Sequence, residues 1–162
     1  MSLVITNPIP PAADKEYWGP RVWLLLHRMA DASNRRDVLL LWNSVLKATN
    51  AVIPCELCRK HMSEYWIQHP LVTKNWSMLT GEQTRKRIRE ALSRFHNAVN
   101  GRLGKPAIDL GTPSPQALAE ANRLYAELVQ LWSSRLTDVS VVAEWRRATS
   151  LLLGLLAGGP QN

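Results

Sequence analysis

The chain has 162 residues, of which 46% are hydrophobic and 20% are charged, a balance that excludes an intrinsically disordered chain and is typical of a globular protein with a core. Twenty Lys and Arg against 13 Asp and Glu give a formal net charge of +7. This charge favours anionic partners such as nucleic acid, a phosphate-bearing cofactor or an acidic protein, although a merely basic exterior would give the same value.

Neither end of the sequence predicts a targeting or membrane segment. The opening MSLVITNPIPP lacks a basic n-region and carries prolines where an apolar stretch would run. The apolar run LLLGLLAGG near the end is shorter than the ~20 residues that cross a bilayer. We therefore expect a cytoplasmic protein without a signal peptide or transmembrane segment. In such a reducing compartment, a CxxC pair is more often catalytic or metal-binding than structural.

Hydrophobic periodicity predicts an all-α protein. Residues 1–13 are Pro-rich and predict an extended arm. Four stretches with helical spacing follow, at about 17–33, 35–51, 55–68 and 80–101. Pro20 is expected near the start of the first helix, where a missing N–H costs least. In the fourth, Thr80 and Gln83 have capping-box spacing, and Gly101 suits its C-terminal end.

The last third of the chain predicts two more helices. Residues 104–115 form an irregular connector by composition, and helices are expected at about 115–134 and 138–157. This part contains no cysteine, no histidine and no motif that we could assign. The sequence leaves open whether it is a packing appendage, an oligomer interface or a docking piece.

The third predicted helix contains the only cysteines, in the stretch PCELCRKH. Cys55 is expected in its first turn, where backbone N–H groups and the positive end of the helix dipole favour a thiolate. Cys58 lies one turn further on, close enough for a disulfide. His61 and Tyr65 share the helix face of Cys58.

Two other interpretations of these cysteines compete with a redox role. A zinc site is one, because Cys55, Cys58, His61 and His69 offer four donors. Against zinc, Pro70 directly follows His69, and the spacing matches no common zinc finger. A purely structural disulfide is the other, but a bridge that closes so short a loop stabilises little by chain entropy.

The first and fourth predicted helices present faces that suit a cofactor. Trp23 and His27 lie on one face, with Gly19 one turn before them. Taken singly, His27 is more often a core histidine. In the fourth helix, a polar stripe at i, i+3, i+4 and i+7 comprises Ser93, His96, Asn97 and Asn100.

Such a polar stripe is either exposed to solvent or buried against a ligand with many hydrogen-bonding groups. Lys105 follows and could neutralise a phosphate. A flat, polar, anionic cofactor would satisfy all three helices, and a dinucleotide flavin has this character. The sequence has no GxGxxG, so a Rossmann binding mode is excluded.

Three blocks of the sequence together carry a family resemblance. YWGPRVWLLLH, PCELCRKH and FHNAVNGRLGKP resemble, in order and spacing over roughly 17–110, the Erv/ALR-type FAD-linked sulfhydryl oxidases. The resemblance implies a four-helix bundle with a short fifth helix that binds FAD, and often a homodimer. Applied to this chain, it predicts an arm (1–13), an FAD-binding oxidase domain (14–112) and a helical C-terminal extension (113–162).

The resemblance also implies roles for single residues. Cys58 corresponds to the flavin-proximal cysteine, and Cys55 to the interchange cysteine that a substrate thiol attacks. No metal ligand is expected. The residues expected to bind the cofactor are Gly19, Trp23, His27, His61, Tyr65, Ser93, His96, Asn97, Val99, Asn100 and Lys105.

The chain departs from the family pattern at several positions. Ser93 and Leu110 stand where many members carry a second, structural cysteine pair, and the shuttle cysteines of many members are absent. Electrons are therefore expected to pass directly from a dithiol substrate protein, thioredoxin-like or another CxxC protein, to Cys55–Cys58, then to FAD and molecular oxygen. Tyr125 or Trp132 is the candidate for the aromatic residue that covers the cofactor in the family.

This chain is compact and lacks a shuttle pair, and in this respect it resembles the family members of large cytoplasmic DNA viruses. The resemblance implies a viral origin. No nucleic acid and no membrane are expected as partners. Two rival functions stay open at this point. One is a zinc-stabilised basic module that binds nucleic acid, and the other is an FAD-binding scaffold that acts through residues 113–162.

Overall fold

The computed structural model describes residues 14–135 and 138–161, and in these ranges the protein consists of α-helices, one 3₁₀ turn at Trp76–Met78 and no strand. This confirms the predicted all-α class. The extended arm predicted for 1–13 lies outside the described residues. The helices are α1 (Lys15–Asp31), α2 (Leu39–Val52), α3 (Glu56–Gln68), α4 (Gly81–Leu103), α5 (Ala117–Arg135) and α6 (Val139–Leu156).

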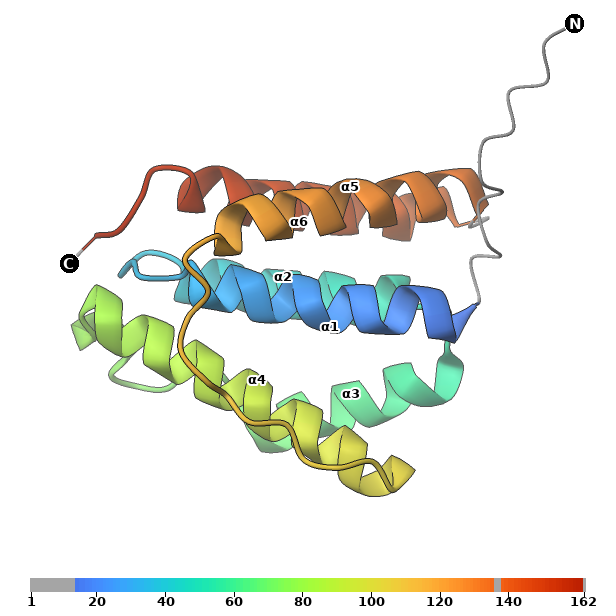
Figure 1. The fold of residues 1–162 in the computed structure, drawn as a ribbon, viewed down its shortest axis with the longest axis horizontal. Helices are drawn as coiled ribbons and strands as arrows, with labels where there is room; N and C mark the ends of the chain where they lie inside the picture. Colours follow the sequence, from blue (N-terminus) through green and yellow to red (C-terminus); the bar gives the residue numbers. More distant parts are fainter. Residues whose placement is uncertain (1–13, 136–137, 162) are drawn as a thin grey trace, which may run out of the picture.

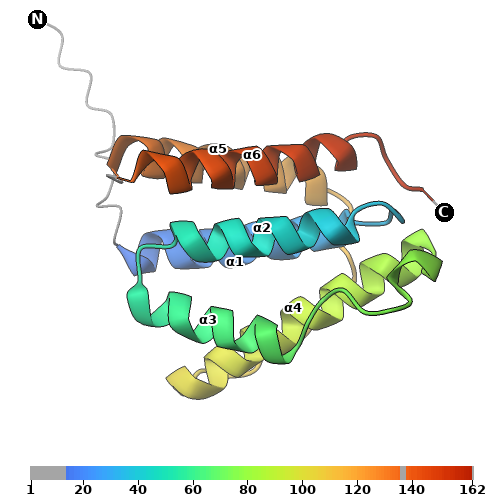
Figure 2. The ribbon, with the colours of Figure 1, turned by 180° about the vertical axis from the view of Figure 1, so that it is seen from behind.

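The six helices form three layers of two (Figures 1 and 2). The middle layer is α1 with α2, and it has α5 with α6 on one side and α3 with α4 on the other. α1 packs on both α5 and α4, and α2 packs on both α6 and α3. The two C-terminal helices are therefore a full layer, and their buried side chains belong to the same hydrophobic core as those of α1 and α2.

Side-chain caps account for several helix ends. The capping box at the start of α4 is confirmed, because Thr80 Oγ1 accepts from the Gln83 N–H at 3.2 Å and Gln83 Oε1 accepts from the Thr80 N–H at 2.9 Å. Asp14 and Asp138 are simple N-caps of α1 and α6, in which one carboxylate oxygen accepts from backbone N–H groups of the first turn.

The predicted end of α4 at Gly101 is wrong. The helix continues through Gly101 and stops at Gly104, whose φ of 69° lies in the left-handed region that favours glycine. No fifth short helix follows, because 104–116 form an irregular connector that runs along α4 (Figure 1).

Two N-terminal predictions also need correction. α1 begins at Lys15, so Pro20 lies inside the helix instead of near its start, and it leaves the Glu16 carbonyl without its helical donor. α2 begins at Leu39 instead of about 35, since Arg35 and Asp37 form an ion pair (2.9 Å) within the loop between α1 and α2.

A buried carboxylate anchors the connector to the helices. Asp31 is 8% exposed at the end of α1, and it accepts from Arg89 Nε of α4 at 2.8 Å and from the Ser114 N–H at 3.2 Å. The Arg89 guanidinium also donates to the carbonyls of Leu110 and Gly111, at 3.1 and 2.8 Å. This network fixes the connector across α1 and α4 before the chain enters α5.

Candidate functional site

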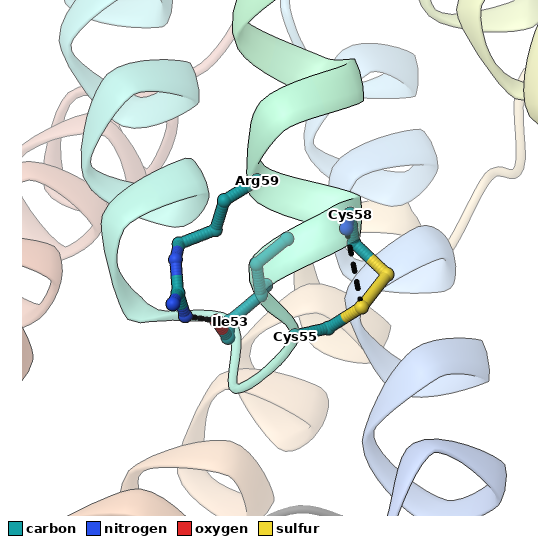
Figure 3. Close-up of a disulfide and its surroundings, with 4 residues drawn as sticks. All are labelled: Ile53, Cys55, Cys58 and Arg59. Carbon is teal, nitrogen blue, oxygen red and sulfur yellow. Dashed lines mark hydrogen bonds between the residues drawn. A yellow bond between two sulfur atoms is a disulfide. The ribbon is translucent and has the colours of Figure 1, made fainter.

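The two cysteines are joined by a disulfide at the start of α3 (Figure 3). Their Cα atoms are 5.2 Å apart. Cys55 is the N-cap of α3 instead of a member of its first turn, and its Sγ accepts the Cys58 N–H at 3.2 Å. The predicted proximity of the two thiols is confirmed. The disulfide also lies at the positive end of a helix, as the thiolate argument requires.

A hydrogen-bonded loop holds this motif on the end of α2. The Ile53 carbonyl, at the C-cap of α2, accepts from the Cys55 N–H at 2.9 Å and from the Arg59 guanidinium at 2.7 Å (Figure 3). Arg59 thereby ties the first turns of α3 to the residue that precedes Pro54. The disulfide is therefore positioned by one backbone and one side-chain hydrogen bond to the same carbonyl.

A cleft of about 320 Å³ opens beside the disulfide, between the start of α1, the end of α2, the start of α3 and the end of α4. Its volume lies at the lower end of the range of about 300–1,000 Å³ for small-molecule sites. The predicted site residues that line it are Gly19, Trp23, Cys55, Cys58, His61 and Val99. The structure thus brings together residues from three of the predicted helices.

A stack of aromatic rings adjoins the cleft through Trp23. The rings of Trp23 and His96 are parallel within 2°, with centroids 3.9 Å apart. His27 Nε2 and His96 Nδ1 are 2.9 Å apart, so one ring donates to the other. Burial lowers the pKa of both histidines, and that of His96 falls to about 4, with the nearby His27 and Lys105 as further causes.

The polar stripe of α4 has the connector as its partner. Asn97 accepts the Ile108 N–H at 2.7 Å, and its amide donates back to the Ile108 carbonyl at 3.4 Å. Asn100 is 7% exposed and donates to the Pro106 carbonyl at 3.3 Å. These two amides therefore fix the connector and do not line the cleft. Lys105 follows on the connector, and its side chain is exposed.

Two further predicted residues lie away from the disulfide. The Tyr65 ring stacks on His69 at 4.3 Å and lines a separate cleft of about 420 Å³ between α3 and α4. Burial raises the pKa of Tyr65. Ser93 is half-buried on α4 and lines neither cleft.

The two aromatic residues suggested as a cover for the cofactor are elsewhere. Trp132 is fully buried and packs edge-on against Trp145 of α6, with centroids 4.8 Å apart. Tyr125 also packs on Trp145. Both belong to the α5–α6 layer, and neither lines the cleft, so this expectation is wrong.

Sequence reasoning missed several residues of the cleft wall. Thr49 and Trp18 line the cleft while 2% and 4% exposed, and Thr49 Oγ1 and Trp18 Nε1 have no hydrogen-bond partner in the described part of the chain. Lys15 and Arg102 line it as well, and it has no acidic residue among its described lining residues. The only sequence signals were a polar residue on an apolar helix face, for Thr49, and the position of Trp18 beside Gly19.

The lining of this cleft suits the ring system of a flavin. Apolar and aromatic side chains suit the flat rings, and two buried polar groups without a partner among the described residues suit a ring edge that carries donors and acceptors. Within the described residues, no three His, Cys, Asp or Glu side chains gather as metal ligands, and the thiols of the zinc alternative are joined to each other. None of the helices in the described ranges is long and apolar enough to cross a bilayer.

Comparison with known proteins agrees with this geometry. Residues 20–118, more than half of the chain, match the model of the Erv1/Alr family. The comparisons with curated proteins and with solved structures gave no match. The matched span contains α2, α3, α4, the disulfide and nearly all of the cleft wall, whereas most of α5 and all of α6 lie beyond it. The chain therefore belongs to the Erv1/Alr family, whose members are FAD-linked sulfhydryl oxidases.

Proposed function

We propose that this protein is an FAD-dependent thiol oxidase that forms disulfides in substrate proteins, with two thiols and molecular oxygen giving one disulfide and hydrogen peroxide. The observation that carries the proposal is the single Cys55–Cys58 disulfide. It caps α3 and lines the same cleft as the aromatic and glycine residues that the family pattern assigns to the cofactor.

The thiol exchange would proceed at Cys55. A substrate thiolate attacks Cys55 Sγ, the Cys55–Cys58 bond breaks, and Cys58 leaves as a thiolate. The second substrate thiolate then attacks the substrate sulfur that is bonded to Cys55 in the mixed disulfide. This step forms the substrate disulfide and releases the Cys55 thiolate. The substrate has lost two electrons and two protons, and the cysteine pair has gained the electrons. The N–H groups at the start of α3 stabilise the thiolates that form.

The cofactor would lie in the cleft beside Cys58. Gly19, Trp23, His61 and Val99 would hold its ring system. FAD, when bound, supplies a two-electron acceptor between the reduced cysteine pair and oxygen. His96, Asn97 and Asn100, with Lys105 near them, are the residues that the family resemblance assigns to the adenosine part, and His27 is the partner of Trp23 as a cofactor contact.

The substrate would be a protein that delivers its own dithiol. The chain has only two cysteines, so it carries no second pair to relay electrons. We propose a thioredoxin-like or other CxxC protein as the donor. We also propose a homodimer and a viral origin, which the family resemblance implies, and a cytoplasmic location, which the sequence favours.

The proposal is tested first on the purified protein and on Cys58→Ser. We expect a yellow protein with a flavin band and no stoichiometric zinc, which consumes oxygen when given dithiothreitol. Cys58→Ser should keep the flavin band and lose turnover, since Cys55 remains but the flavin-proximal thiolate that would reduce the cofactor is gone. Glu64→Ala, an exposed change on the same helix, is the control and should keep the wild-type rate. A colourless zinc protein, or full turnover in Cys58→Ser, would contradict the proposal.

A further inference from the structure

Two leucines at the mouth of the cleft are exposed. Leu57 is 63% exposed and Leu103 is 51% exposed, and both line the cleft that contains the disulfide. Leu26, deeper in the same wall, is only 2% exposed. Single exposed leucines are common on protein surfaces. These two leucines are unusual because they come from different helices and line the same cleft as the disulfide.

Leu57 lies between the two cysteines in the first turn of α3, and Leu103 is the last residue of α4. Leu57 lines the cleft together with Cys55 and Cys58, so a segment that reaches the disulfide from the cleft passes this side chain. Leu103 lines the same opening from α4. We call Leu57 and Leu103 the apolar lip.

The charges around the lip are complementary to an acidic partner. Lys15 and Arg102 line the cleft, and neither forms an ion pair within the described part of the chain. Lys60 is exposed two residues after Cys58. Glu56, also exposed, is next to Cys55 but does not line the cleft. The net charge of +7 has the same sign.

We propose that the apolar lip docks an extended, thiol-bearing segment of the substrate protein, one with an apolar side chain next to its cysteine and acidic residues on either side. The inference rests on the proposed oxidase function and names the class of substrate for it. The lip covers the apolar side chain of the incoming segment while its thiolate reaches Cys55, and the cations of the cleft attract its carboxylates.

Two matched pairs of peptides test the lip. The first pair carries a CxxC flanked by acidic residues and has either Leu or Ser next to the first cysteine. The second pair is identical except that serine replaces both cysteines and a fluorophore is attached. Binding of the second pair by anisotropy reports docking without any redox step. Oxygen consumption with the first pair, and with dithiothreitol, reports turnover.

We expect the wild-type protein to bind the Leu peptide about tenfold more tightly than the Ser peptide, as burial of part of a leucine allows. Leu57→Ser and Leu103→Ser should each remove most of this preference. Both variants should keep the flavin band. Their rate with dithiothreitol should stay within about twofold of the wild-type rate. Leu151→Ser is the matched control, since this leucine is 50% exposed on α6, away from the cleft.

Several results would contradict the proposed docking role of the apolar lip. They are equal binding of the two peptides by the wild-type protein, a preference kept by both lip variants, and a preference lost in Leu151→Ser as well. Loss of the flavin band in the lip variants would assign the leucines to the cofactor instead of the substrate. If the flavin-loaded wild-type protein oxidises neither peptide nor dithiothreitol, the proposed function fails, while the anisotropy comparison still decides the docking role.

Discussion

At the scale of single residues, the His27–His96 pair makes the free energy of unfolding depend on pH. Burial lowers the pKa of His96 to about 4, whereas in an unfolded chain it is near 6.5. Between these values the unfolded state binds more protons than the folded state, so the free energy of unfolding falls as the pH drops through this window. We expect urea unfolding of cofactor-free protein to show this loss, and His96→Gln to reduce it.

The control for this experiment is His69→Gln. His69 is exposed and is not part of the pair, so its replacement should leave the pH dependence as it is in the wild-type protein. Equal pH dependence in the wild-type protein and in His96→Gln would show that His96 does not titrate as the structure indicates.

Part of the site could be predicted from single residues, and the remainder required the tertiary structure. Spacing found the disulfide, Gly19, Trp23 and His61, because helical periodicity places each on a definite face. It found the polar face of Asn97 and Asn100 but not its partner, because the backbone at Pro106 and Ile108 returns to α4 through a connector without periodicity. The Thr49 hydroxyl, which has no partner among the described residues, could not be inferred, since an isolated threonine in a helix usually has a local partner.

At the scale of elements, the helices followed from periodicity and caps, while some ends depended on contacts distant in sequence. The start of α4 was predicted correctly because both capping-box residues are local. Its end was misplaced, since Gly101 and Gly104 are both plausible stops and only the backbone conformation selects one. Ser93 and Leu110 stand where the family resemblance implied a second cysteine pair, and near Leu110 the connector is held to α4 by the Arg89 guanidinium.

Helix α3, which begins at the disulfide, has few buried side chains. Met62 is the single buried residue of α3, whereas α1 and α2 each bury a broad set of side chains. Because local opening is easiest where few apolar contacts must break, amides of α3 should exchange with deuterium faster than those of α2. Mass spectrometry of peptides from both helices measures this. Equal protection of α3 and α2 would mean that the contacts of α3 are stronger than its burial indicates.

At the scale of the whole molecule, the C-terminal layer is expected to be integral to stability. Leu128 of α5 is fully buried in the common core, so Leu128→Ala should lower the free energy of unfolding by about 2–5 kcal/mol. Leu151→Ala, at a site 50% exposed on α6, should cost much less. Chemical unfolding of both variants measures this, and a small effect at Leu128 would support a loosely attached appendage.

The three-layer arrangement also limits how two copies could associate by two-fold symmetry. Such a pair buries the same surface patch on both copies, and the broad faces of α1 and α2 are already covered within one chain. A symmetric pair would therefore meet through an outer layer or an edge. Pairing through α5 and α6 would leave both disulfides on the outside, open to large protein substrates. Pairing through α3 and α4 would place the two redox centres on the shared side, where only a narrow segment could reach them.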